Sequence, residues 1–334
     1  MRVKNRNSVL VVGLGSMGRR RIRLLKSIAP KLEIVGVDLA PDRRAQAESE
    51  CEIVTRGQLG DALREFAPKS VVVSTSPLSH GSIVMECLKA GANVFTELNL
   101  VSDWYKKAMS LAERNKLKLF VSSTFFYRRE TQFVAKTVRG KKVNYIYHSG
   151  QYLPDWHPWE SYKNFFVADK RTNACREILA IEFPWLINAF GEIESIHVMK
   201  DKNSTLDIDF PDNYIISVNH KNGNKGVFCQ DVISRKGLRR LEVYSEKLHL
   251  FWEGTPQTLS AYDVKTKELK AVSLYNDVEQ KGEYNANIIE NMYRDELRAF
   301  LAYVKNGKLP PYTFADDYKV LAMIDKIESG EYCF

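Results

Sequence analysis

The chain has 334 residues, a length that predicts two domains. Of these residues 44% are hydrophobic and 27% charged, a composition that excludes a disordered chain. No apolar run approaches the ~20 residues needed to span a bilayer, and we expect no membrane partner. The net charge of +8 is spread along the chain in doublets such as Arg239-Arg240, which favours a solvated basic surface over nucleic-acid binding.

The five cysteines include no CxxC pair, so we expect neither a disulfide framework nor a metal site. The basic segment at residues 1–8 precedes an apolar stretch, Val9–Val12, that is too short for the core of a signal peptide. We interpret this stretch as a buried strand and expect a cytoplasmic protein.

Short apolar, β-branched runs alternate with helical patterns through the first third of the chain. The predicted strands are residues 9–12, 33–37, 71–74, 93–96 and 118–122. The predicted helices are residues 17–28, 43–49, 59–66, 81–90 and 104–115. This alternation predicts an α/β Rossmann domain over residues 1–124, with a parallel sheet and crossover helices.

Strand-like alternation then dominates from residue 143 to about 273, with one helix near residues 176–190. The predicted strands in this part are residues 193–198, 214–218, 226–232 and 241–244. Two amphipathic helices follow, near residues 286–304 and 315–327. We therefore expect an α+β domain over residues 125–334, built on a largely antiparallel open sheet for substrate binding and oligomerisation, with the C-terminal helix packing back on the first domain.

The strongest motif is the segment GLGSMG at residues 13–18, between a predicted strand and a predicted helix. Gly13 permits a tight turn, Gly15 lets the backbone approach a pyrophosphate, and Gly18 lets the helix pack on the strand. Ser16 and Met17 begin the helix, whose free N–H groups and dipole favour an anion. The motif predicts a dinucleotide site.

The second predicted strand is followed by Asp38, 20 residues after the last glycine of the motif. A carboxylate there can accept hydrogen bonds from ribose hydroxyls and repels a 2′-phosphate, so we expect NAD rather than NADP. Arg43 and Arg44 keep NADP open as an alternative, because guanidinium groups can pair with that phosphate. Helical spacing predicts that most of the basic side chains at residues 19–23 are solvated.

Four further segments resemble a known family. Residues 71–80 (VVVSTSPLSH) resemble the (A/S)TPPxxH segment of the Gfo/Idh/MocA oxidoreductases, the family of glucose–fructose oxidoreductase and inositol dehydrogenase. Residues 90–100 (AGANVFTELNL) resemble its AGKHVxxEKPL segment. Residues 127–129 (YRR) match its N-x-R stretch loosely, and residues 290–330 resemble its C-terminal helix pair.

The resemblance implies that the nicotinamide lies at the carboxyl edge of the first sheet, under the second domain. It implies that the cofactor is lined by Ser74, Thr75, Ser76 and His80, with Glu97 and Asn99 near the nicotinamide ribose. It also implies small-molecule substrates, mostly sugars, sugar nucleotides and polyols. The open face of the second sheet would form the interface of a homodimer or homotetramer.

The chain departs from the family pattern where the chemistry is expected. The motif lysine falls on Leu98, and the general acid/base histidine of a later D-x(2–3)-H motif falls on Ile181. Neither side chain can titrate or donate a hydrogen bond. Hydride transfer from a carbinol still requires a base for the hydroxyl proton, so another residue must supply it.

Glu177 and Glu182 are the first candidates, on a predicted helix that is otherwise apolar. Burial near the nicotinamide would raise the pKa of such a carboxyl toward the working range, whereas a buried structural ion pair is the alternative. His157 is a further catalytic candidate, in the loop QYLPDWHPW at residues 151–159. This loop resembles the substrate-domain loop of family members linked to bacterial surface-sugar biosynthesis.

Four residues are candidates for substrate binding. In the same loop Asp155 could bind hydroxyls and Trp156 could stack on a sugar ring, although packing in the core is an equal alternative. Tyr127 and Arg128 follow the last strand of the first domain, where ligands of open α/β sheets bind. Arg128 could hold a carboxylate or phosphate, with a salt bridge as its alternative.

The leading hypothesis is an NAD(H)-dependent oxidoreductase acting on a hydroxyl or carbonyl of a sugar or sugar-derived acid, with a role in surface-carbohydrate metabolism. The rival hypothesis is an NAD(H)-binding sensor or assembly protein without hydride transfer, which the leucine and isoleucine at the motif positions favour. A third possibility retains bound NAD through an internal redox cycle.

Overall fold

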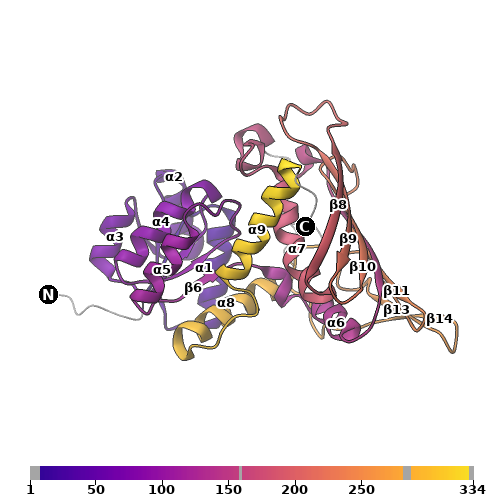
Figure 1. The fold of residues 1–334 in the computed structure, drawn as a ribbon. Helices are drawn as coiled ribbons and strands as arrows, with labels where there is room; N and C mark the ends of the chain where they lie inside the picture. Colours follow the sequence, from indigo (N-terminus) through magenta and orange to yellow (C-terminus); the bar gives the residue numbers. More distant parts are fainter. Residues whose placement is uncertain (1–7, 158–159, 281–286, 331–334) are drawn as a thin grey trace. The chain divides into compact units, whose positions relative to one another are not determined.

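A computed structural model describes residues 8–157, 160–280 and 287–330, and the chain divides into two compact units (Figure 1). Unit 1 comprises the chain up to Thr124 together with Tyr293–Lys319. Unit 2 comprises Phe125–Met292 and the chain from Val320 onward. Unit 1 is therefore assembled from two segments that are far apart in the sequence.

Unit 1 is built on a parallel sheet of six strands in the order β3-β2-β1-β4-β5-β6. The strands are β1 (Ser8–Val12), β2 (Glu33–Val37), β3 (Val54–Arg56), β4 (Ser70–Val73), β5 (Asn93–Thr96) and β6 (Leu119–Val121). The central strands are buried on both faces, which explains their continuous Val and Leu runs. This is the doubly wound order, in which successive strands are added on one side of β1 up to β3 and on its other side from β4 onward.

Helices connect these strands and cover the sheet (Figure 1). They are α1 (Ser16–Ile28), α2 (Pro41–Cys51), α3 (Leu59–Phe66), α4 (Pro77–Lys89) and α5 (Tyr105–Arg114). The C-terminal part of the chain adds most of α8 (Glu290–Asn306) and the first turns of α9 (Phe314–Ser329) to this unit. In α8, Phe300 packs against the stacked rings of Phe95 and Phe120 on β5 and β6.

Unit 2 is built on a sheet of eight strands in the order β14-β13-β12-β11-β7-β10-β9-β8, with only β7 and β10 parallel to each other. The strands are β7 (Asn144–Gly150), β8 (Ile193–Asp201), β9 (Asn213–His220), β10 (Lys225–Asp231), β11 (Leu238–Ser245), β12 (Leu248–Trp252), β13 (Ser260–Asp263) and β14 (Glu268–Ala271). The helices α6 (Arg129–Val138) and α7 (Ala174–Phe190) lie wholly in this unit, which also includes α9 from Val320 onward. Short 3-10 turns are found at Thr124–Tyr127, Leu153–Asp155, Tyr162–Asn164 and Phe166–Ala168.

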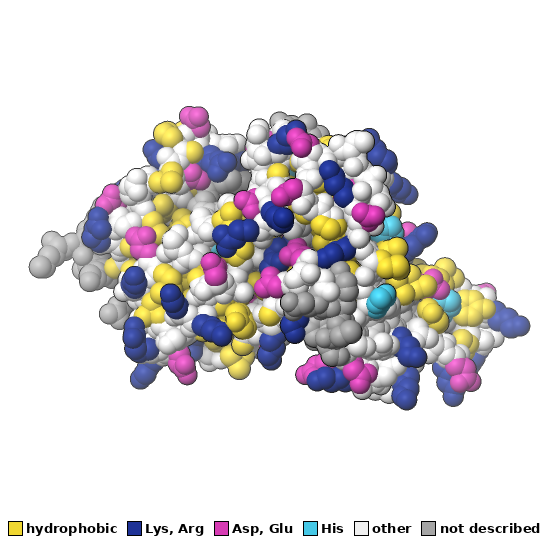
Figure 2. Space-filling model, turned by 45° about the horizontal axis from the view of Figure 1, so that its top comes forward, with side chains coloured by type: hydrophobic (Ala, Val, Ile, Leu, Met, Phe, Trp, Pro, Cys, Tyr) yellow, Lys and Arg dark blue, Asp and Glu magenta, His cyan; other side chains and the backbone are white. Residues whose placement is uncertain are grey.

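The two faces of the second sheet differ. One face packs its aromatic side chains against α7, where Tyr147 meets Trp185 edge to face and Tyr145 stacks on Phe190. The other face keeps large apolar side chains exposed, among them Ile146, Met199 and Ile215. Figure 2 shows hydrophobic side chains, with histidines among them, gathered over the strands of unit 2.

The predicted fold class, a Rossmann domain followed by a largely antiparallel α+β domain, is confirmed. The structure adds β3 and α6, and it adds β7, β12, β13 and β14 within the part where strand-like alternation was predicted without individual bounds. The helix predicted from residue 286 begins at Glu290, and residue 286 itself lies outside the described residues. None of the described helices combines the length and apolar character needed to cross a membrane.

Candidate functional site

Two turns meet at the carboxyl ends of β1 and β4. Gly13 has a φ of +90°, and a Cβ added to it would lie 2.5 Å from the carbonyl oxygen of Ser74. A larger residue at position 13 would therefore suffer both backbone strain and a backbone clash. Because β1 and β4 flank the point where the strand order reverses, this is the edge at which open α/β sheets bind ligands.

The loop between β1 and α1 also fits a dinucleotide. A Cβ on Gly18 would lie 1.8 Å from the Gly13 carbonyl oxygen, so glycine is needed for close packing of helix on loop. A Cβ on Gly15 would have no atom of the described residues within 4 Å, so this residue faces open space. Gly15 caps α1 without any side-chain hydrogen bond, which leaves the N–H groups of Ser16 and Met17 for an anion.

Asp38 lies directly after β2 and is anchored by backbone donors. Its Oδ2 accepts a hydrogen bond from the Leu14 N–H at 2.8 Å, and its Oδ1 accepts one from the Ala40 N–H at 2.9 Å. Each carboxylate oxygen keeps a lone pair for a ribose hydroxyl. Arg43 is largely exposed with its Nη1 3.9 Å from the same carboxylate, whereas the Arg44 guanidinium donates to the carbonyls of Asp38 and Leu39.

The turn after β4 carries an unsatisfied hydroxyl. The Oγ of Ser74 is buried and has no hydrogen-bond partner among the described residues. The Thr75 hydroxyl accepts from Ser79 Oγ at 2.7 Å, and Ser76 is exposed at the start of α4. A buried hydroxyl without a partner is costly unless a ligand or water satisfies it. This observation fits a cofactor held between the two turns.

His80 and Asn99 lie behind this turn. The His80 Nε2 lies 2.9 Å from the Thr75 carbonyl oxygen and its Nδ1 lies 2.7 Å from Asn99 Oδ1, while the Asn99 Nδ2 donates to Thr96 Oγ1 at 2.9 Å. Both ring nitrogens of His80 therefore face oxygen atoms, and burial lowers the pKa of the ring. Both side chains are buried and support the turn after β4 from behind.

Glu97 follows β5 at the same edge, but its carboxylate is already paired. The Arg21 guanidinium donates to both of its oxygens, at 2.6 and 2.9 Å. Arg20 and Arg21 are buried, so the prediction that the arginines after the glycine loop are mostly solvated is wrong for these two. The helical spacing that suggested exposure did not reveal that α8 covers this side of α1 with Tyr293.

On α7 of unit 2, Glu182 is fully buried and surrounded by donors. Its Oε2 accepts from the Tyr147 hydroxyl at 2.8 Å and from the Trp185 indole at 2.6 Å. Its Oε1 accepts from Arg239 Nε at 2.8 Å and from Ser149 Oγ at 3.3 Å. The structure therefore realises the alternative of a buried ion pair, and these four donors leave little capacity for a substrate proton.

Glu177 lies in the first turn of α7 and has the opposite environment. Its Oε2 is buried and has no hydrogen-bond partner among the described residues. Burial raises the pKa of this carboxyl to about 7, although the nearby Arg239 charge lowers it. A carboxyl with an unpartnered oxygen and a pKa near neutrality is suited to accept and return a proton.

The loop after β7 is only partly described, because residues 158 and 159 of its predicted aromatic segment lie outside the described residues. His157 packs edge to face on Phe165 at 4.6 Å between ring centroids, and burial lowers its pKa. The Trp156 indole donates to the Gln151 carbonyl at 3.0 Å, and Asp155 is exposed. The structure thus packs His157 against an aromatic ring and anchors Trp156 within its own loop.

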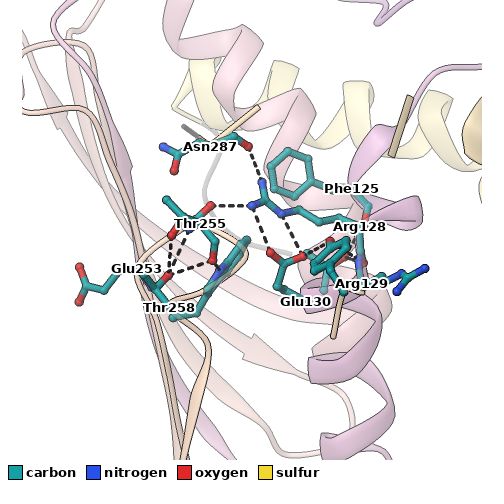
Figure 3. Close-up of polar contacts among 12 residues, drawn as sticks. Phe125, Arg128, Arg129, Glu130, Glu253, Thr255, Thr258 and Asn287 are labelled. Carbon is teal, nitrogen blue, oxygen red and sulfur yellow. Dashed lines mark hydrogen bonds and ion pairs between the residues drawn. The ribbon is translucent and has the colours of Figure 1, made fainter. Parts of the chain in front are cut away.

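Arg128 is completely buried, and its guanidinium is surrounded by hydrogen-bond partners (Figure 3). Its Nη1 donates to the Asn287 carbonyl at 2.8 Å and its Nη2 to the Gly254 carbonyl at 2.6 Å. Glu130 lies 3.3 Å from its Nε and Nη2. These contacts match the salt-bridge alternative, so an anionic substrate would have to displace them. Tyr127 beside it is partly buried.

One important residue was missed. Arg239 was predicted to be solvated with its neighbour, but it lies partly buried on the α7 side of β11, paired with Glu182 and 5.0 Å above the Phe125 ring. Arg240 points to the other face and pairs with Glu253. Side chains of a strand alternate between faces, so the doublet itself indicated that one arginine would face inward.

Comparison with known families identifies the first domain. Residues 7–123 match the GFO_IDH_MocA family model, described as an oxidoreductase family with an NAD-binding Rossmann fold. The resemblance predicted from the motifs is therefore confirmed, as is NAD as the cofactor of this fold. Among curated proteins, no sequence matches the chain.

Solved structures share the fold over the whole length. A probable dehydrogenase from Thermotoga maritima has a TM-score of 0.77 at 18% identity, covering 97% of both chains. An oxidoreductase from Agrobacterium radiobacter, in complex with NAD+, L-tartaric acid and magnesium, has a TM-score of 0.83 at 11% identity, covering 99% of this chain and 98% of its own. The UDP-N-acetylglucosamine 3-dehydrogenase of Acidithiobacillus ferrooxidans has a TM-score of 0.75 at 14% identity, covering 96% of both chains.

Proposed function

Residues 7–123 belong to the Gfo/Idh/MocA family of NAD-binding oxidoreductases, and on that premise we propose that the whole chain is an NAD(H)-dependent oxidoreductase. Its substrate in this proposal is a sugar or a sugar-derived acid, oxidised at a hydroxyl or reduced at a carbonyl. Neighbours of the same fold support this class, since one acts on a UDP-sugar and another was solved with a hydroxy acid. A role in surface-carbohydrate metabolism remains part of the proposal.

The observation that carries the proposal is the geometry at the ends of β1, β2 and β4. Open space at Gly15, uncapped N–H groups on α1 and the unpartnered Ser74 hydroxyl fit a pyrophosphate and its sugar. Asp38 is positioned to accept the ribose hydroxyls, and its charge disfavours a 2′-phosphate. Thr75, Ser76 and Glu97 complete the proposed lining, while His80 and Asn99 hold its backbone in place.

The bound cofactor supplies the hydride acceptor or donor. In the direction of oxidation a base must take the hydroxyl proton, and we assign this role to Glu177, the carboxyl with an unpartnered oxygen. Glu182 orients Arg239, whose charge acts on Glu177. His157 is the second candidate for proton transfer. Asp155, Trp156 and Tyr127 are proposed to contact the substrate. Arg128 holds the backbone at Gly254 and Asn287.

The first experiment is a pair of titrations of the purified protein with NADH and NADPH, after mass spectrometry for nucleotide that co-purifies. NADH binding clearly tighter than NADPH, or co-purified NAD(H), would support the cofactor assignment. Turnover would then be measured on a panel of sugars, sugar nucleotides and sugar acids. Loss of kcat in Glu177→Gln with retained NADH binding supports the base, whereas unchanged kcat removes it.

The second candidate function is an NAD(H)-binding sensor or assembly protein without turnover. The observation in its favour is the loss of titratable groups at Leu98 and Ile181, together with the saturation of Glu182 by donors. A protein that binds NADH yet turns over no substrate in the panel supports this reading. Co-purified NAD(H) that changes redox state with substrate, without net reduction in solution, identifies an internal redox cycle.

A further inference from the structure

A buried arginine in unit 1 is shared by two carboxylates. The Arg21 guanidinium donates to Glu97 through Nε and Nη2, and Nη2 also lies 2.7 Å from Glu296 Oε2. Arg21 and Glu296 are completely buried, whereas the Glu97 side chain keeps 14% of its surface exposed. Only one of the three groups can therefore meet a ligand directly.

The cluster joins three elements at the carboxyl edge of the sheet. Arg21 comes from α1 and Glu97 from the end of β5, while Glu296 comes from α8 in the C-terminal part of the chain. Glu296 also accepts from the Ser123 N–H at 2.7 Å and from Ser122 Oγ at 3.0 Å, just after β6. These contacts fix Glu296 between the sheet edge and α8, so its carboxylate has one orientation toward Arg21.

We propose that Glu296 is a positioning residue that acts through Arg21 to set the orientation and charge of Glu97 toward the bound cofactor. Glu97 cannot turn away from Arg21 without breaking a bidentate pair, and Arg21 cannot follow it without leaving Glu296 unpaired. The assignment rests on the proposed function, because it requires that Glu97 faces the cofactor. It adds a residue of the C-terminal segment to the determinants of cofactor affinity.

The charge of the cluster changes near neutral pH. Burial raises the pKa of Glu296 to about 7, opposed by Arg21 and reinforced by Glu97. The other groups facing the cluster are Tyr293 on α8, over whose ring Arg20 and Arg21 lie, and His80 on α4, whose pKa is lowered by burial. Below the pKa of Glu296, the positive charge of Arg21 and the negative charge of Glu97 cancel. Above it a second carboxylate leaves one net negative charge.

That added negative charge favours a cationic oxidised nicotinamide over a neutral reduced one. The dissociation constant of NAD+ is therefore expected to fall about threefold relative to that of NADH between pH 6 and pH 8. Glu296→Gln removes the titrating group, so this variant is expected to show a constant ratio. Asp295→Asn, which removes an exposed carboxylate from the neighbouring position of α8, is the matched control and is expected to behave like the wild type.

The test is a double-mutant cycle on cofactor binding, measured by calorimetry with NAD+ and NADH on the full chain. Glu97→Gln is expected to weaken NAD+ binding about tenfold. Glu296→Gln is expected to weaken it less, and the double variant to bind no more weakly than Glu97→Gln alone. Arg21→Lys keeps the charge without the bidentate geometry and repeats the cycle should Glu296→Gln fail to fold.

Additive effects of the two glutamate substitutions, or a pH-dependent ratio that survives Glu296→Gln, would overturn the assignment and leave the cofactor site intact. Absence of NAD+ and NADH binding in the wild type would instead overturn the proposed function and this assignment with it. The two failures are separated by the wild-type titration, which is measured first.

Discussion

At the scale of single residues, the preference for NAD rests on Asp38. Replacement by alanine removes the acceptor for the ribose hydroxyls and frees the Leu14 N–H. We expect NADH binding to weaken by ~1.5–3 kcal/mol, the value of a charged hydrogen bond. The measurement is a fluorescence titration with NADH, with Asp42→Ala on the exposed start of α2 as control. An unchanged dissociation constant in Asp38→Ala would contradict its role.

The two carboxylates of α7 are expected to respond differently when each is replaced by glutamine. Glu182→Gln breaks a buried ion pair and leaves Arg239 without its carboxylate. We expect a loss of about 3–5 kcal/mol in the free energy of unfolding, measured by urea denaturation. A loss below about 1 kcal/mol would mean that the ion pair adds little to stability.

Glu177→Gln is expected to change the pH dependence of stability instead. Burial raises the pKa of Glu177 from 4.5 to about 7, so the folded protein holds an extra proton between these values. The corresponding stabilisation is complete at low pH and is lost as the pH rises through about 7. Urea denaturation across this range should therefore show a flatter profile in Glu177→Gln than in the wild type. Identical profiles would indicate that Glu177 is solvated.

At the scale of elements, the β1–α1 loop separates folding from binding. Gly15→Ala adds a methyl group into open space, whereas Gly18→Ala drives one into the Gly13 carbonyl. We expect Gly15→Ala to keep the melting temperature of the wild type yet to lose NADH affinity about tenfold or more, because the methyl group occupies the path of the pyrophosphate. Gly18→Ala should lower the melting temperature. Full NADH affinity in Gly15→Ala would argue against a cofactor over this loop.

The sequence patterns predicted the first sheet well because its strands are short, apolar and separated by clear helical periods. The short strand Val54–Arg56 was not predicted, because only Thr55 in it is buried and no alternation can be recognised. Helix α6 is short, and two of its four buried residues, Glu130 and Thr131, are polar, so its apolar period is weak. Hydrophobic periodicity predicts such an element only when enough buried apolar residues recur at the spacing of a helix or a strand.

The side-chain clusters could not be predicted in the same way. Arg21 is buried because α8, more than 270 residues later, supplies Glu296 and Tyr293. Arg128 is buried because it meets the carbonyls of Gly254 and Asn287. In both cases the sequence near the arginine reads as solvated or ligand-binding. The partners come from distant segments, which no spacing rule connects.

At the scale of the whole molecule, the outer face of the second sheet predicts self-association. Met199, Ile215 and Cys229 lie side by side in register on β8, β9 and β10, and Met199 and Ile215 are 57% and 42% exposed. Ile146 and Tyr244 extend this apolar surface across β7 and β11. A patch of this kind on a regular sheet fits a homodimer or a homotetramer, because a two-fold axis lets one surface cover its own copy.

We therefore expect Ile215→Lys to dissociate the assembly, since a two-fold interface would bury two added charges for each substitution. The measurement is light scattering coupled to size exclusion at several protein concentrations. Leu309→Lys, at an apolar side chain of unit 1 that is 70% exposed, is the matched control and should keep the wild-type mass. A wild type that is monomeric at every concentration would refute self-association through this face, and dissociation by both variants would show that added charge acts without regard to position.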